Sequence, residues 1–135
     1  MIFRKTHIAL LICLSGFGAA LADQLVIAGK SHLGAKVLSY DDGRLGFRTA
    51  DGRMQSSWVD QIELLILDRG GALEDFNQAE RFLAAGEVEK AAIRYERAAR
   101  LTDEFWPELA ATRLIAAYVR TGQIDKATMS FIRTA

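Results

Sequence analysis

The sequence has a single cysteine, Cys13, and this residue lies in an apolar stretch near the N-terminus. Two basic residues, Arg4 and Lys5, precede the apolar run 8–14, and small residues follow it up to Ala22. A basic start, a short apolar run and a small-residue end are typical of a secretory signal peptide. We therefore predict cleavage after Ala22, which leaves a mature chain without cysteine. That excludes disulfides, thiol catalysis and cysteine-based metal sites.

The sequence also lacks an apolar run long enough to cross a membrane. The stretch 8–22 has 22 − 7 = 15 residues, whereas a spanning helix needs about 20, so a cleaved signal is favoured over a retained anchor. The alternative of a lipidated cysteine rests on Leu10-Leu11-Ile12-Cys13, which loosely resembles a bacterial lipobox, but Ile12 stands where that motif has a small residue. We expect an exported protein of the periplasm or cell envelope, or a secreted one, with no membrane span after cleavage.

Charge of one sign is missing as well. The 17 basic residues balance the 17 acidic ones, and residues 23–68 carry five basic against seven acidic side chains. Nucleic-acid binding needs a basic surface, so we expect no nucleic-acid partner. Arg94, Arg97 and Arg100 do form a basic stripe, but Glu96 stands four residues before Arg100, at the spacing of a surface ion pair. We interpret the stripe as a solvated face and keep nucleic-acid or anionic-lipid binding as a disfavoured alternative.

Catalytic motifs are absent from the sequence. It has no G-x-S-x-G, no H-E-x-x-H, no P-loop and no Rossmann glycine pattern. After cleavage His32 is the only histidine, and no metal-ligand spacing surrounds it, so we expect a histidine in a loop. Adjacent acids occur at 41–42, 74–75 and 103–104, where turn chemistry and the helix dipole account for them. We predict a protein that is not an enzyme and that has no cofactor, no metal and no small-molecule substrate.

Short strand-like runs fill residues 23–68. Asp-Gly pairs at 42–43 and 51–52 separate alternating runs, and this dipeptide is a strong hairpin signal because glycine accepts the positive φ of a tight turn. The expected strands are 25–28, 36–40, 44–49, 53–58 and 62–67. A meander of this length does not bury both of its faces as a flat sheet. We therefore predict a small five-stranded antiparallel β-barrel, curled and nearly closed.

Four stretches carry a further pattern in this region, namely 34–40, 42–49, 51–52 and 59–66. Together they resemble the small five-stranded barrels of the Sm-like kind, although many unrelated barrels share such a pattern. Sm-like relatives imply RNA binding, which the acidic balance of this region opposes. The resemblance therefore informs the fold more than the function.

Beyond a candidate linker at 69–71 the composition shifts to Ala, Glu and Arg, and the apolar spacing becomes helical. Helices are expected at 72–85, 87–101, 108–121 and 123–134, and the only proline, Pro107, suits the first turn of the third. Six positions recur at an offset of 122 − 86 = 36 residues: Phe82/Tyr118, Gly86/Gly122, Val88/Ile124, Ala91/Ala127, Tyr95/Phe131 and Ala98/Thr134. A period in the thirties predicts paired helices stacked as a solenoid, an architecture that binds other proteins.

Small residues, aromatics and a turn glycine recur at fixed places in the two helical units. They are Ala79, Phe82, Gly86, Ala91, Tyr95 and Ala98 in the first unit and Tyr118, Gly122, Ala127 and Phe131 in the second. Together they resemble the tetratricopeptide repeat, in which such aromatics are core packing. The second unit departs from that family at Ile115, where a small residue is usual. The offset of 36 also departs from the family's 34, which we assign to two extra residues around 105–107.

The resemblance implies that a partner binds a groove lined by the first helix of each unit. That groove would present Phe76, Glu80, Leu83, Thr112, Ala116 and Arg120. Repeats that grip a peptide carboxylate have lysine and asparagine where this chain has Phe76 and Glu80, so that activity is not expected. We predict a non-enzymatic adaptor for a protein partner. The alternative is a structural or oligomerising role in which Trp58, Leu65 and Leu67 of the barrel drive self-association.

The predicted chain is α+β in two modules, a small barrel followed by an all-α helical repeat. Its segments are a signal peptide at 1–22, the barrel at 23–68, a linker at 69–71 and two repeats at 72–135. Ala135 falls before the second unit would finish, and stacked repeats need about three units for stability. We expect either a truncated array or one that a partner completes, and we favour truncation.

Overall fold

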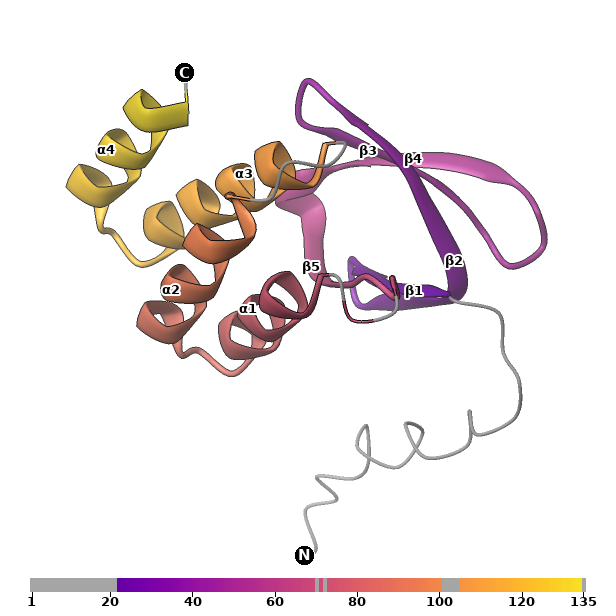
Figure 1. Ribbon diagram of the computed structural model, residues 1–135. Coiled ribbons are helices and arrows are strands. Elements are labelled where there is room, and N and C mark those ends of the chain that lie inside the picture. The colour runs from indigo at the N-terminus through magenta and orange to yellow at the C-terminus, as the bar shows by residue number, and fades with distance from the viewer. Residues whose placement is uncertain (1–21, 70, 72, 101–104, 135) are drawn as a thin grey trace, which may run out of the picture.

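The computed structural model describes residues 22–69, 71, 73–100 and 105–134 (Figure 1). Residues 1–21 of the predicted signal peptide, Gly70 of the predicted linker and Ala135 lie outside this part. Within it the predicted α+β class is confirmed, because five antiparallel strands precede four helices. The strands are β1 (Asp23–Ile27), β2 (Lys30–Asp41), β3 (Arg44–Arg48), β4 (Met54–Trp58) and β5 (Ile62–Ile66), with a 3₁₀ turn η1 (Val59–Gln61) before β5. The helices are α1 (Glu74–Ala84), α2 (Val88–Ala98), α3 (Trp106–Arg120) and α4 (Ile124–Thr134).

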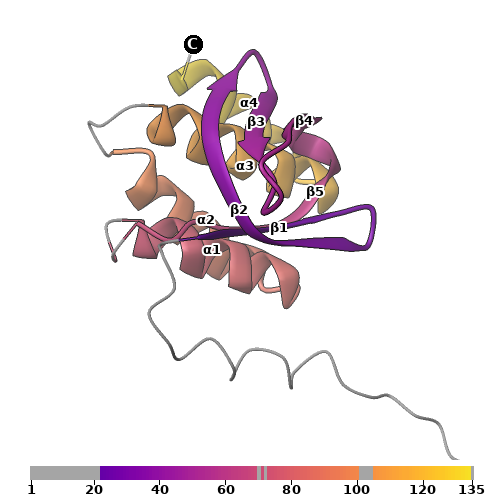
Figure 2. The same cartoon turned by 90° about the vertical axis from the view of Figure 1, so that its right-hand side faces the viewer.

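The strands form one sheet in the order β4-β3-β2-β1-β5, and every neighbouring pair is antiparallel. The long strand β2 holds the sheet together, because its first half pairs with β1 and its second half with β3. Figure 2 shows the strong curvature of β2 between these two partners. β4 and β5 stand at opposite edges and do not pair with each other. The described sheet is therefore curled but open, and barrel closure is not observed.

The turn between β2 and β3 follows the sequence signal closely. Asp42 and Gly43 both have a positive φ, of 46° and 79°, as a two-residue hairpin turn requires. The turn between β1 and β2 lies at Ala28-Gly29, where no Asp-Gly pair marks it. For that reason β2 begins at Lys30 rather than at residue 36, where the sequence pattern predicted its start.

The four helices form a row in which each packs against the next (Figure 1). The turns that join α1 to α2 and α3 to α4 have the same geometry. Each contains a glycine with a positive φ, 78° at Gly86 and 72° at Gly122, as is common just past the end of a helix. The N–H of Glu87 donates to the Phe82 carbonyl over 2.8 Å, and the N–H of Gln123 donates to the Tyr118 carbonyl over 2.9 Å. The offset of 36 residues in the sequence thus recurs as two equivalent turns.

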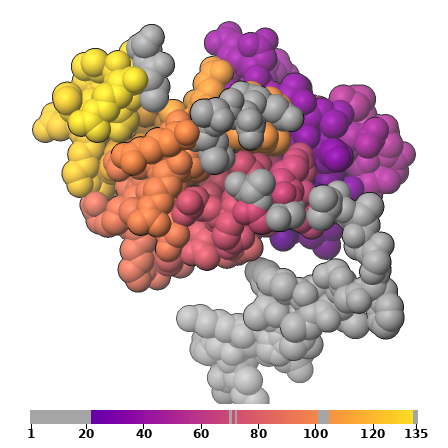
Figure 3. Space-filling model, viewed as in Figure 1, coloured from indigo at the N-terminus to yellow at the C-terminus, as the bar shows by residue number. Residues whose placement is uncertain are grey.

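The sheet and the helices share one hydrophobic core. Leu25, Phe47 and Leu65 of the sheet, Phe76 of α1 and Leu109 of α3 are buried in it. α1 packs against β5 and α3 packs against η1, and the space-filling view shows strands and helices in direct contact (Figure 3). None of the described helices is long and apolar enough to cross a membrane.

Arg69, at the start of the predicted linker, is tied to the sheet. Its Nη1 atom donates to Asp23 Oδ1 over 2.5 Å, and its Nη2 atom donates to the Val37 carbonyl over 3.0 Å. The guanidinium carbon also lies 5.2 Å from the ring centre of Trp106 in α3. Since Asp23 accepts the Val37 N–H as well, over 2.7 Å, this region links β1, β2 and α3.

Candidate functional site

A buried ion pair lies where the helices meet the sheet. Arg113 of α3 donates from Nε and Nη2 to the two carboxylate oxygens of Glu80 of α1, over 2.6 and 2.7 Å. Both residues are 1% exposed, and the Tyr95 hydroxyl of α2 donates to the same carboxylate over 2.6 Å. Burial is the largest single influence and lowers the pKa of Arg113, but the charge and hydrogen bonds of Glu80 together with Tyr95 outweigh it, and the net shift is upward. Burial, and then the charge of Glu80, raise the pKa of Tyr95. The guanidinium therefore stays charged and the phenol stays neutral.

The same pair binds backbone groups along β5 and the turn before it. Arg113 Nη1 donates to the carbonyls of Ile62, over 2.7 Å, and Val59, over 3.2 Å. The Leu65 N–H donates to the Glu80 carboxylate over 2.9 Å. A carboxylate and a guanidinium with all these partners have their hydrogen-bonding groups satisfied in the buried interior, where an unpaired charge would be costly.

Asn77 of α1 continues this cover along β5. Its side-chain oxygen accepts the Leu67 N–H and its side-chain nitrogen donates to the Leu67 carbonyl, both over 2.7 Å. These bonds replace those that a further strand would make. The outer edge of β5 is therefore covered by α1, and no buried side-chain nitrogen or oxygen within the described residues lacks a hydrogen-bond partner.

The six residues predicted to line a partner groove are divided by this packing. Phe76 and Glu80 are each 1% exposed, inside the shared core. The Thr112 hydroxyl shares a hydrogen bond of 2.7 Å with the Tyr40 hydroxyl of β2. The remaining three are half-buried or exposed: Leu83, Ala116 and Arg120. The chain's own sheet occupies much of the side of α1 and α3 on which a partner was expected.

The three residues considered for self-association are also separated. Leu65 and Leu67 are buried in the core, with exposures of 0% and 1%. Trp58 at the end of β4 is 47% exposed, and the guanidinium of Arg44 lies 4.9 Å from its ring centre. Of the three, only Trp58 is available to a partner.

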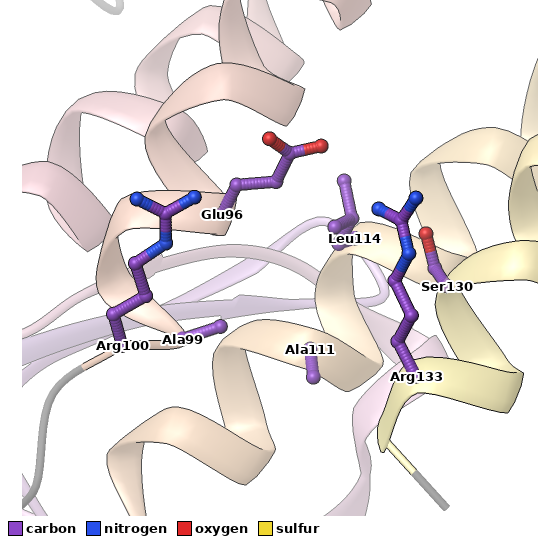
Figure 4. Close-up of a pocket in the computed structure, with 7 residues that line it drawn as sticks. All are labelled: Glu96, Ala99, Arg100, Ala111, Leu114, Ser130 and Arg133. Carbon is purple, nitrogen blue, oxygen red and sulfur yellow. The ribbon is translucent and has the colours of Figure 1, made fainter.

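A groove that the sequence pattern did not predict lies between α2 and α4, with α3 as its floor (Figure 4). Its volume is about 230 Å³. The floor is apolar, since Ala111 and Leu114 of α3 are buried there and Ala99 follows the end of α2. Figure 4 shows the guanidinium groups of Arg100 and Arg133 on opposite sides of this floor. Neither arginine belongs to an ion pair within the part of the chain that the structure describes.

Glu96 and Ser130 complete the lining of this α2–α4 groove. Each stands about one helical turn before an arginine of the groove, Glu96 before Arg100 and Ser130 before Arg133. The ion pair that the sequence predicts between Glu96 and Arg100 is not among those formed by the described residues. The groove thus combines one acidic and two basic side chains around an apolar floor.

The groove continues toward the start of α4. A second hollow of about 310 Å³ shares three lining residues with the first: Glu96, Ser130 and Arg133. Here Lys126 of α4 binds Glu89 of α2 over 3.3 Å and lies 5.7 Å from the ring centre of Tyr118. Burial, and then the charges of Glu96 and Glu89, raise the pKa of Tyr118. The ion pair ties α2 to α4 at this end, and the neutral phenol lines the wall.

The basic stripe on α2 is not a uniform solvated face. Arg94 binds Asp75 of α1 over 2.9 Å, whereas Arg100 lines the α2–α4 groove. The sequence around α2 indicates the groove only weakly, through Glu96, the small residue Ala99 and Arg100. The remaining lining residues come from α3 and α4. The groove can be recognised only when the positions of α2 and α4 relative to each other are known.

The sequence offers His32 and the adjacent acids at 41–42, 74–75 and 103–104 as candidates for chemistry. Within the described ranges, no group of three His, Cys, Asp or Glu side chains is placed to hold a metal ion. His32 lies in β2 and not in a loop, and its ring packs edge-on against Phe47 with 5.7 Å between ring centres. The adjacent acids at 103–104 lie outside the described residues.

Comparison with protein-family models, curated proteins and solved structures finds no match for this chain.

Proposed function

We propose that this chain is an exported, non-enzymatic adaptor that binds a protein partner in the α2–α4 groove. The observation that carries this proposal is the lining of the groove, in which Arg100 and Arg133 flank a floor of Ala99, Ala111 and Leu114. An apolar floor binds an aliphatic side chain, and a guanidinium binds a carboxylate through two parallel hydrogen bonds. The fitting ligand is a peptide segment that carries both.

The extent of the groove suits a peptide segment. The first hollow has a volume of about 230 Å³. The second, of about 310 Å³, extends it along α4, as a segment of chain requires. In this shape a carboxylate of the peptide fits between the two arginines, and an aliphatic side chain of the peptide fits on the floor. The negative charge of Glu96 disfavours a polyanion as the ligand.

We propose further that the helical half is a pair of tetratricopeptide-like repeats and that the curled sheet is an open relative of small Sm-like barrels. The equivalent turns at Gly86 and Gly122 support the first part, as does the burial of Ala79, Ala91 and Tyr95. In such repeats the first helices carry the binding face. Here the sheet covers much of that side of α1 and α3, and we therefore assign binding to the side where α2 and α4 stand.

Export is the part of the proposal that depends on residues 1–22. A signal peptide there would place the adaptor in the periplasm or cell envelope, or outside the cell. The test is N-terminal sequencing of the protein recovered from an exporting bacterial host. We expect Asp23 as the first residue, and an unprocessed Met1 would contradict the signal-peptide interpretation.

Peptide arrays test the binding proposal. Acetylated and amidated peptides that combine leucine or valine with aspartate or glutamate are probed with the wild-type chain, and the affinities of the binders are measured in solution. We expect Arg100→Glu and Arg133→Glu each to weaken binding at least about tenfold, because a hydrogen bond to a charged group contributes about 1.5–3 kcal/mol. Arg97→Glu is the matched control, since Arg97 is exposed on α2 outside the groove. Equal binding by all three variants would place the site elsewhere.

A self-associating, structural role is the second candidate. The observation that favours it is the edge of β4, which pairs only with β3.

A further inference from the structure

The two edge strands of the sheet differ in whether their outward-facing backbone groups are bonded. The outer edge of β5 is covered by side chains, since Asn77, Glu80 and Arg113 bind its backbone groups. β4 stands at the opposite edge and pairs only with β3. No comparable hydrogen bonds from side chains of the helices reach β4 within the described part of the chain.

The hydrogen bonds at the two ends of β4 show which of its backbone groups face outward. The Val59 N–H donates to the Gly43 carbonyl over 2.9 Å, and the Thr49 N–H donates to the Arg53 carbonyl over 2.8 Å. In an antiparallel pair, every second residue exchanges bonds with the partner strand. Residues 53, 55, 57 and 59 therefore face β3. The residues whose N–H and C=O groups face the open edge are Met54, Ser56 and Trp58.

β4 also lacks the features that usually prevent edge pairing. Native edge strands carry charges, proline or bulges, whereas β4 reads Met-Gln-Ser-Ser-Trp and pairs regularly with β3. Met54 is 65% and Trp58 is 47% exposed. The Trp58 carbonyl accepts a hydrogen bond from the Ser57 hydroxyl over 3.2 Å, which leaves it a second lone pair.

We propose that β4 pairs antiparallel with β4 of a second copy of this chain, about a two-fold axis at Ser56. Since 54 + 58 = 2 × 56, this register puts Met54 of one copy opposite Trp58 of the other, a favourable sulfur–aromatic pair. It also lets all three outward-facing residues exchange hydrogen bonds. A register centred on Gln55 or Ser57 pairs only two of them.

The charges that flank β4 favour the same arrangement. Arg53 precedes the strand and Asp60 follows it, and both are exposed. Arg53 contacts Asp51 of its own loop over 2.8 Å, yet its side chain remains 77% exposed. Antiparallel pairing brings Arg53 of one copy near Asp60 of the other, whereas parallel pairing would bring like charges together. Pairing of β4 with β5 of another copy is excluded by the side chains that cover β5.

This assembly specifies the self-associating role that is the second candidate function, and it uses none of the residues of the α2–α4 groove. Disulfide trapping tests its register. In the full chain with Cys13→Ser, Ser56→Cys places two cysteines across the axis at a Cα separation of about 5.5 Å, which a disulfide spans. We expect this variant to form a covalent dimer under oxidation. Gln55→Cys is the control, because its counterpart is displaced by two positions, and it should remain largely uncrosslinked.

Light scattering tests the pairing without a crosslink. We expect the wild-type chain to have twice the mass of one copy and Ser56→Lys to have the mass of one, since two lysines would face each other at the axis. Ser56→Glu alone should also lose the dimer, and an equimolar mixture of Ser56→Lys and Ser56→Glu should regain it. Circular dichroism confirms that the variants fold. A monomeric wild-type chain would overturn the proposal. So would a dimer that persists in Ser56→Lys and that Ser56→Cys does not crosslink.

Discussion

Arg113 and Glu80 are 33 residues apart in the sequence and form two hydrogen bonds of 2.6 and 2.7 Å in the interior. One belongs to the first helix of the second unit and the other to the first helix of the first unit. Because both also bind backbone groups of β5 or the turn before it, this one pair joins two helical units to the sheet. Its integrity should therefore govern the stability of the whole chain.

Removal of one partner should show this. We expect Arg113→Met to lower the free energy of unfolding by about 3–5 kcal/mol, because it leaves the Glu80 carboxylate buried without a counter-charge. Denaturation in urea measures the loss. The double variant Glu80→Met/Arg113→Met should be less destabilised than Arg113→Met alone. Lys126→Ala, which removes an exposed ion pair with Glu89, should cost at most about 1 kcal/mol. A cost for Arg113→Met no greater than that of Lys126→Ala would contradict the role of the pair.

Tyr95 should make the stability fall at alkaline pH. Burial, and then the charge of Glu80, raise its pKa above the ordinary value of 10.0. The unfolded phenol thus loses its proton near pH 10 while the folded one keeps it, so the stability is intact below pH 10 and declines above it. We expect a decline of about 1.4 kcal/mol per pH unit from this group. Unfolding measured against pH should show a smaller decline for Tyr95→Phe than for Tyr118→Phe.

Asn77 should protect the end of β5 from solvent exchange. Asn77→Leu introduces an apolar side chain of similar size and leaves both backbone groups of Leu67 without their side-chain partner. We expect a loss of about 1–3 kcal/mol for each buried group left unpaired. Hydrogen exchange at the Leu67 amide should become much faster. Asn77→Asp keeps the acceptor for the Leu67 amide, so this amide should retain more of its protection from exchange than in Asn77→Leu. Equal exchange rates in the wild type and Asn77→Leu would refute the role of this side chain.

The elements could be predicted from the sequence because their signals are local. Alternation and the Asp-Gly pair at Asp42 located β3 and its hairpin, and helical spacing with the two recurring glycines located the four helices. The burial of Glu80 could not be predicted in this way. A glutamate on a helix has the same local pattern whether it faces water or a guanidinium, and the guanidinium belongs to Arg113 in another helix. The α2–α4 groove was missed for the same reason, since its two arginines come from different units.

The equivalence of the two helical units can be tested at their turns. Gly86 and Gly122 have φ of 78° and 72°, and no other side chain or backbone would block an added Cβ at either position. The cost of Gly→Ala should therefore come from the left-handed backbone alone, about 1–2 kcal/mol, and should be similar in Gly86→Ala and Gly122→Ala. Urea denaturation measures both. A cost at one glycine only would contradict equivalent turns.

The central claim is that a partner binds in the α2–α4 groove and not on the side of α1 and α3 that faces the sheet. NMR of the isotope-labelled chain, titrated with the strongest acidic and aliphatic peptide from the array, tests it most directly. We predict shift changes at Ala99, Ala111 and Leu114, with little change at Leu83 and Arg120. Shift changes centred on Leu83 and Arg120, with the groove residues unaffected, would contradict the account.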